Sequence, residues 1–236
     1  MIQHSKLKSI VYHLYPGILI TLFFGVTTPY FVTMGFPPQL SMLIAIVVIV
    51  VPIILFHLNN AKKNENVKRI YDLVEYTETL PTYKLILYTL GLIIFAFLVY
   101  GLTQPINEII TDKFLYWLPD WYKARDFEGY SKSIILVTLI VNLILNGLLA
   151  PYLEELYFRG YLLPRMKTWG KFAPLMSAIL FSLYHFWQPQ IYLTLVIALF
   201  PMTYLVWKTK NLKLAIYTHC GLNIVGALLS FGMINQ

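Results

Sequence analysis

The chain has 236 residues, of which 58% are hydrophobic and only 12% are charged, whereas a soluble domain carries about 25% charged residues. This composition excludes an ordinary soluble domain and indicates an integral membrane protein whose first partner is the lipid bilayer. The 18 Lys and Arg outnumber the 11 Asp and Glu, but no basic run with interleaved aromatics lies outside the loops. We therefore expect no nucleic-acid binding and assign the basic residues to cytoplasmic loops.

A helix that spans a bilayer needs about 20 mostly apolar residues. About seven segments approach this length, which predicts an all-α polytopic membrane protein. The fifth of them is short. In chain order they cover roughly Ile10–Val32, Leu40–Leu58, Tyr83–Leu102, Ser133–Leu153 with a polar extension, Phe172–Trp187, Ile191–Trp207 and Leu212–Met233.

The basic residues alternate between the loops in a way that predicts orientation. With the N-terminus in the cytoplasm, most of them fall inside, and the outer segments hold only Lys113, Lys123, Arg125 and Lys132. Cytoplasmic loops are enriched in Lys and Arg, so we expect the N-terminus inside and the C-terminus outside. The small size and the lack of extra domains favour a bacterial cell membrane.

Two stretches outside the spans are informative. Ala61–Thr82 is polar and charged, and we expect a short cytoplasmic helix or loop there. Phe114–Phe127, FLYWLPDWYKARDF, mixes tryptophans and tyrosines with charges, which is typical of the membrane–water interface. We expect one structural domain, with N-terminal membrane helices in residues 1–130 and a helical core with a polar intramembrane cavity in residues 131–236.

The fourth span ends in LEELYFRG, which places carboxylates where charges are costly. Glu155 and Arg159 are four residues apart, so they share a helix face and can form an ion pair. Glu154 points about 100° away and has no such partner in its own helix. A carboxylate without a partner inside a membrane is a candidate general base.

The fifth and seventh spans carry further polar groups at the same spacing. Phe181 and His185 lie four apart in FSLYH, and His219 and Asn223 lie four apart in HCGLN. At a rise of about 1.5 Å per residue, these groups and Glu154 all lie roughly 10–20 Å from the inner ends of their helices. They can therefore meet at one depth, in a cavity that we expect to open to the cytoplasm.

Other polar residues in the spans have simpler interpretations. We expect His13 and His57 to make interhelical hydrogen bonds, and Asn142 and Asn146 to bond a neighbouring helix or to line a water path. Cys220 adjoins His219, but neighbouring helical residues point about 100° apart, so it suits packing better than a catalytic dyad. Pro151 lacks an N–H, which frees the carbonyl of Gly147 and favours a kink.

Three motifs together resemble a known family. EELYFRG matches the EExxxR signature of the CAAX protease and bacteriocin-processing family (CPBP, also called Abi), Phe181–His185 matches its FxxxH motif and His219–Asn223 its HxxxN motif. The resemblance covers about Ser133 to Met233. Within that family, the chain is similar to the type II CAAX prenyl endopeptidases, which are described as intramembrane glutamic proteases.

The resemblance implies a catalytic role for each residue. Glu154 would activate a water, and His185 would help to hold it. His219 and Asn223 would donate hydrogen bonds to the oxyanion, and Glu155 and Arg159 would form the supporting ion pair. These roles agree with what peptide hydrolysis needs. The implied function is an intramembrane endopeptidase that cleaves a peptide or protein substrate near the cytoplasmic leaflet.

Three alternatives remain at this point. One Glu and two His could form a His₂Glu zinc site, although no HExxH occurs and Asn223 would have no ligand role; otherwise we expect no cofactor. A non-catalytic bacteriocin-immunity or accessory protein could use the same fold to bind a peptide or a partner. A small transporter would show repeats and discontinuous helices in both halves, and neither is visible.

Overall fold

The computed structural model describes residues 1–123, 127 and 129–232. Arg125 and Met233, which the sequence analysis placed in an outer loop and at the end of the last span, lie outside these ranges. Within them the chain is helical and forms no strand, apart from one isolated bridge between Thr77 and Asn211. The predicted all-α fold is therefore confirmed.

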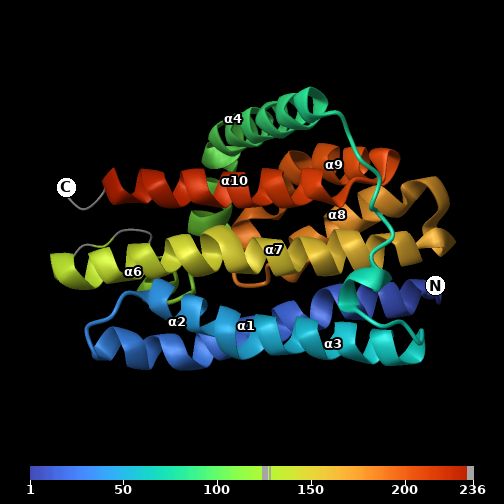
Figure 1. Cartoon of the computed structure of the whole chain (residues 1–236). Helices are drawn as coiled ribbons and strands as arrows, with labels where there is room; N and C mark the ends of the chain where they lie inside the picture. Colours follow the sequence, from blue (N-terminus) through green and yellow to red (C-terminus); the bar gives the residue numbers. More distant parts are fainter. Residues whose placement is uncertain (124–126, 128, 233–236) are drawn as a thin grey trace.

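The helices run side by side along one direction, with α4 tilted across α10 (Figure 1). Short 3₁₀ and π-helical stretches, labelled η, join or extend the α-helices. In chain order the elements are α1 (Lys6–Thr33), α2 (Pro38–Ala45), η1 (Ile46–Val50), α3 (Val51–Asn64), η2 (Ile70–Leu73), α4 (Thr82–Phe114), α5 (Asp120–Lys123), α6 (Lys132–Ile144), η3 (Leu145–Leu149), α7 (Ala150–Glu154), η4 (Glu155–Leu162), η5 (Leu163–Arg165), η6 (Lys167–Phe172), α8 (Ala173–Tyr184), η7 (Pro189–Ile191), α9 (Tyr192–Thr209) and α10 (Leu212–Ser230).

Within the described residues, 6 helices are long and apolar enough to cross a membrane. They are Lys6–Thr33, Pro38–Asn64, Thr82–Phe114, Lys132–Arg165, Pro189–Thr209 and Leu212–Ser230. The predicted fifth span is present as α8, but it has only 12 residues. At about 1.5 Å per residue this is roughly 18 Å, less than the hydrocarbon thickness of a bilayer. The chain is thus a polytopic membrane protein in which α8 ends partway along the bundle.

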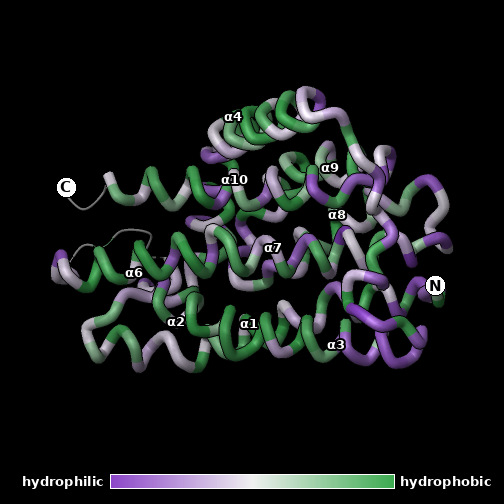
Figure 2. Tube along the Cα trace, viewed as in Figure 1, coloured by the Kyte–Doolittle hydropathy of each residue, from purple (hydrophilic) through white to green (hydrophobic). Residues whose placement is uncertain are grey.

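The two ends of the bundle differ in character. One end holds the N-terminus, the end of α3 and the start of α8, and hydrophilic residues gather there (Figures 1 and 2). We call it the basic end; its cations include Lys62, Lys63, Lys68, Lys167, Lys171 and Lys208. The opposite end holds the α1–α2 turn, the start of α6 and the end of α10. By the distribution of Lys and Arg, the basic end is the one expected in the cytoplasm.

Polar contacts close the basic end. Arg165 is fully buried, and its guanidinium donates to both carboxylate oxygens of Glu65, at 2.9 and 3.0 Å, and to the carbonyls of Leu73 and Tyr161. Burial alone would raise the pKa of Glu65, but the hydrogen bonds and the charge of Arg165 hold that pKa below its usual value. The predicted cytoplasmic segment 61–82 is therefore tied to the end of η5 rather than loose.

A close approach between helices fixes the end of α8. Gly17 of α1 packs against the carbonyl of Tyr184, and a Cβ at position 17 would lie 1.9 Å from that oxygen. No side chain fits in this space, so α1 can approach α8 here only with glycine. The contact sets the position of the turn that carries Tyr184 and His185.

Candidate active site

The motif residues converge on one cavity of about 630 Å³ in the interior of the bundle. Glu154 at the end of α7, His185 after α8, and His219 and Asn223 on α10 all line it. Glu155 and Arg159 follow Glu154 on η4 and are fully buried behind it. Three segments that are separate in the sequence thus bring their polar groups together, as the spacing predicted.

Glu155 links two of the motifs. Arg159 Nη1 donates to Glu155 Oε1 at 3.0 Å, so the predicted ion pair forms, and both side chains have 0% exposure. His219 Nδ1 donates to the same oxygen at 2.7 Å. Arg159 also lies 4.0 Å from the centre of the Phe181 ring and donates to Thr203 Oγ1 at 3.3 Å. Glu155 therefore orients the imidazole of His219 as well as pairing with Arg159.

Glu154 has a partner that the motifs do not include. Tyr184 Oη donates to Glu154 Oε1 at 3.0 Å, and the phenol is buried at 1% exposure. The other oxygen, Oε2, lies 4.0 Å from His219 Nε2. Glu154 itself is 7% exposed and lines the cavity. Its carboxylate is consequently held at one oxygen and faces the cavity and His219 with the other.

His185 is placed by the end of its helix. The FxxxH spacing lets His185 Nδ1 donate to the carbonyl of Phe181 at 2.8 Å, one turn back, and the ring stands edge-on to Phe181 with centroids 5.0 Å apart. Because Nδ1 donates, Nε2 keeps its lone pair and can accept a hydrogen bond from a molecule in the cavity.

Asn223 is bound to an irregular helix. Asn223 Nδ2 donates to the backbone carbonyl of Asn146 at 2.8 Å. Asn146 belongs to the π-helical stretch η3, in which each N–H pairs with the carbonyl five residues earlier. In that register the carbonyl of Asn146 would accept a hydrogen bond from the backbone N–H of residue 151, which proline lacks. The carbonyl left without this bond is therefore that of Asn146, and the prediction that it is that of Gly147 is wrong. The second hydrogen of the Asn223 amide remains for a ligand.

The cavity extends from these residues towards the opposite end of the bundle. There it is lined by residues near the α1–α2 turn, on α5, after α8 and at the end of α10, namely Gln39, Trp121, Tyr122, Gln188 and Ser230. On the other side, every residue from Leu153 to Met166 is buried and fills the space. The cavity therefore does not reach the basic end, contrary to the expectation that it opens to the cytoplasm.

The expected interfacial segment borders this opening. Trp121 and Tyr122 of α5 line the cavity, and Tyr122 Oη donates to the carbonyl of Trp187 at 2.7 Å. Phe114 and Trp117 before it are both 68% exposed, which suits a belt of aromatics at the membrane surface. Asn142 and Asn146 also line the cavity. The prediction that they line a water path therefore describes their position better than the prediction that they bond a neighbouring helix.

The remaining polar candidates lie elsewhere. His57 contacts Tyr15 and Tyr157 through its two ring nitrogens, which confirms an interhelical bond. His13 instead donates to the carbonyl of Ser9 in its own helix, so the interhelical prediction is wrong for it. Cys220 does not line the cavity and is partly buried beside Leu148.

A His₂Glu zinc site would need three ligands that converge on one point. No group of three or more His, Cys, Asp and Glu side chains that could hold a metal ion occurs among the described residues. His219 Nδ1 and His185 Nδ1 are bonded to Glu155 and to a backbone carbonyl, which leaves the Nε2 atom of each ring as its free ligand atom. The zinc alternative stays a prediction, and no step below uses a metal.

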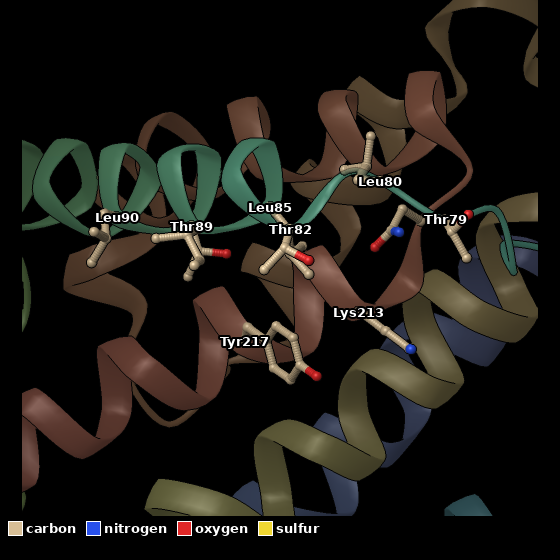
Figure 3. A pocket seen from close by; sticks show the side chains of 10 residues that line it. Thr79, Leu80, Thr82, Leu85, Thr89, Leu90, Lys213 and Tyr217 are labelled. Carbon is tan, nitrogen blue, oxygen red and sulfur yellow. The ribbon is translucent and has the colours of Figure 1, made fainter.

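A second cavity, of about 590 Å³, is a cleft between the first turns of α4 and α10 (Figure 3). It is lined mainly by threonines and aliphatic residues, with Lys213 and Tyr217 on the α10 side. None of the motif residues lines it. Further along the two helices, α4 and α10 are in close contact, since a Cβ on Gly221 would lie 2.7 Å from the Ile93 side chain.

The comparisons with known proteins agree with this arrangement. Residues 136–225, which hold all three motifs, match the family described as "Type II CAAX prenyl endopeptidase Rce1-like". This part of the chain is similar to the Rce1-like family. The match confirms the resemblance seen in the motifs and indicates, at the family level, a CAAX-type intramembrane protease. It leaves α1, α2, α3 and α4 outside, although α1 packs directly on the turn after α8. No curated protein and no solved structure matches the chain.

Proposed function

We propose that this Rce1-like protein is an intramembrane glutamic endopeptidase, in which Glu154 activates a water for attack on a peptide bond. The observation that carries the proposal is the convergence of Glu154, His185, His219 and Asn223 on one cavity inside the bundle. Burying an ionised carboxylate inside the membrane costs free energy, so a carboxylate at this position indicates a functional site. Its neighbours are the groups that peptide hydrolysis needs.

The first step is proton transfer and attack. A water held between Glu154 and the free Nε2 of His185 gives a proton to the Glu154 carboxylate, and the resulting hydroxide attacks the scissile carbonyl carbon. Tyr184 holds the carboxylate by its hydrogen bond to Oε1, which leaves Oε2 as the oxygen that accepts the proton. General-base catalysis of this kind typically contributes about 10²–10⁴ in rate.

The second step is stabilisation and collapse of the tetrahedral intermediate. The carbonyl oxygen becomes an oxyanion, which accepts hydrogen bonds from Asn223 Nδ2 and from His219 Nε2. For Nε2 to donate while Nδ1 donates to Glu155 Oε1, both ring nitrogens of His219 must carry a proton. The C–N bond then breaks, and Glu154 returns its proton to the leaving amine. One oxyanion donor is worth about 10²–10³ in rate.

Arg159 compensates the charge of Glu155 inside the site, because the two side chains form an ion pair at 3.0 Å. A buried site of this kind avoids the cost of an uncompensated charge in a low-dielectric region. Arg159 is fully buried and does not line the cavity, so its role is to compensate the charge of Glu155.

The test compares membranes that carry wild-type protein with membranes that carry Glu154→Ala at matched expression. Both are incubated with a panel of tagged peptides, including prenylated CAAX peptides and peptide-pheromone precursors, with and without a zinc chelator. Cleavage that is lost with Glu154→Ala and unaffected by chelator supports the proposal. Cleavage that survives the substitution, or that the chelator abolishes, contradicts it. A cellular phenotype retained by the variant without any cleavage would favour the non-catalytic binding protein.

A further inference from the structure

The geometry points to a substrate that reaches the site from the extracytoplasmic face, as an extended peptide segment threaded down the cavity from the end opposite the basic loops. This inference rests on the proposed function, because it names the route and the kind of substrate for the same site. It differs from the sequence expectation of a cavity open to the cytoplasm.

The shape of the cavity gives the direction. Its lining runs from Glu154 and His219 outward to Gln39 at the start of α2, to Gln188 after α8 and to Ser230 at the end of α10. The start of α2 and the end of α10 lie at the end that carries the α1–α2 turn (Figure 1), and the turn after α8 lies partway along the bundle. The route from the catalytic groups thus leads away from the basic end.

The basic end offers no comparable path. The stretch from Leu153 to Met166 is buried throughout and includes Arg159 and Arg165 at 0% exposure. Arg165 is bonded to Glu65 and to two backbone carbonyls, so it seals the bundle at that end. The separate cleft between α4 and α10 (Figure 3) shares none of its described lining residues with the cavity that holds the motif residues.

The orientation follows from charge. Lysines and arginines concentrate at the basic end, and such residues mark the cytoplasmic side of membrane proteins. The opposite end instead presents exposed aromatics, Phe114, Tyr116 and Trp117, next to the cavity opening, as expected at a membrane surface. With the basic end inside, the opening faces outside.

The wall of the cavity suits a peptide backbone. Gln39, Asn142, Asn146, Gln190 and Asn223 line it, and each carboxamide can both donate and accept hydrogen bonds, as an unpaired peptide group requires. Gln190 is only 9% exposed, yet its Oε1 has no partner, and neither has Oε1 of Gln39. Both acceptors are therefore available to a peptide N–H in the cavity.

The charges on the cavity wall limit the kind of peptide that can bind there. Among the described residues that line the cavity, none is Lys, Arg or Asp, and Glu154 is the only carboxylate. A free substrate C-terminus would bring a carboxylate into a cavity whose described lining residues include no Lys or Arg to pair with it. A neutral wall of amides and aromatics fits the interior of an extended chain, such as the outer juxtamembrane segment of a membrane protein or a secreted peptide.

Accessibility to a membrane-impermeant thiol reagent tests the route. Cys220 is the only cysteine, so Cys220→Ala provides a cysteine-free background. Single cysteines are then placed at the cavity opening (Gln188→Cys and the conservative Ser230→Cys), on the cavity wall (Asn142→Cys) and at the basic end (Lys171→Cys). Each protein is treated with a charged methanethiosulfonate in intact cells and again after permeabilisation.

We expect the three cavity positions to react in intact cells at least tenfold faster than position 171, which should react fully only after permeabilisation. The inference is overturned if the cysteine at position 171 reacts in intact cells and the three cavity cysteines react only after permeabilisation. It is also overturned if the cysteines at positions 188 and 230 react from outside while the cysteine at position 142 reacts from neither side. Two positions at the opening guard against the failure of one variant to fold. The labelling needs no catalysis, so its outcome is independent of whether Glu154→Ala abolishes cleavage.

Discussion

Replacing Arg159 by methionine should destabilise the protein strongly. The substitution removes the guanidinium that pairs with Glu155 at 3.0 Å and leaves a fully buried carboxylate with His219 as its remaining partner. Breaking a buried ion pair by removing one member costs about 3–5 kcal/mol. For a chain of this size, about 1 kcal/mol corresponds to roughly 2–4 °C in Tm, so we expect a fall of about 6–20 °C.

The assay is thermal unfolding of the purified protein in detergent, with two controls. Arg69→Met breaks the Arg69–Asp72 pair, whose arginine is 78% exposed, and should leave Tm essentially unchanged. Glu155→Gln combined with Arg159→Met removes the uncompensated charge, so it should recover part of the loss. The reasoning is refuted if Arg159→Met unfolds at the wild-type temperature, or if the double variant is less stable than Arg159→Met.

Three further outcomes follow from particular contacts. Tyr184→Phe removes the hydrogen bond to the Glu154 carboxylate. We expect peptide cleavage to slow by about 10–100-fold, the effect of losing a hydrogen bond to a charged group, and the acidic limb of the pH–rate profile to move to higher pH. If Tyr184 has a purely structural role, that limb stays in place. Gly17→Ala places a Cβ 1.9 Å from a backbone oxygen and should lower both Tm and cleavage, while Gly25→Ala, with nothing within 4 Å, should change neither. The pKa of Glu65 is held below its usual value. The ionised carboxylate therefore contributes to stability above about pH 4.5, and this contribution is lost as the pH falls through the lowered pKa. Glu65→Gln should flatten the dependence of Tm on pH in that acidic range.

Local spacing was enough to predict that the polar groups lie at one depth and can meet. The i, i+4 rule placed Glu155 beside Arg159, and the structure has this pair. Hydrophobic run length predicted the six long spans, but it also counted α8, whose 12 residues are too few to cross a bilayer. Both are properties of a single helix, and a single helix is what periodicity describes.

Features that depend on how helices meet were not predictable. Tyr184 has the appearance of a core aromatic in its own segment, and only the packing of α8 against α7 brings it to Glu154. The carbonyl freed by Pro151 was misassigned because a π-helical register cannot be read from an apolar sequence. The direction of the cavity depends on which end the buried side chains fill, which no motif encodes.

The most direct test of the account is a kinetic comparison of purified wild-type protein and Glu154→Gln, reconstituted in lipid vesicles with a peptide that the wild type cleaves. Glutamine keeps the shape of the side chain and its contact with Tyr184, but it cannot take a proton from water at neutral pH. We expect kcat to fall by about 10²–10⁴ with Tm preserved, the range for loss of a general base. A variant that folds as well as the wild type and cleaves at a similar rate would contradict the central claim.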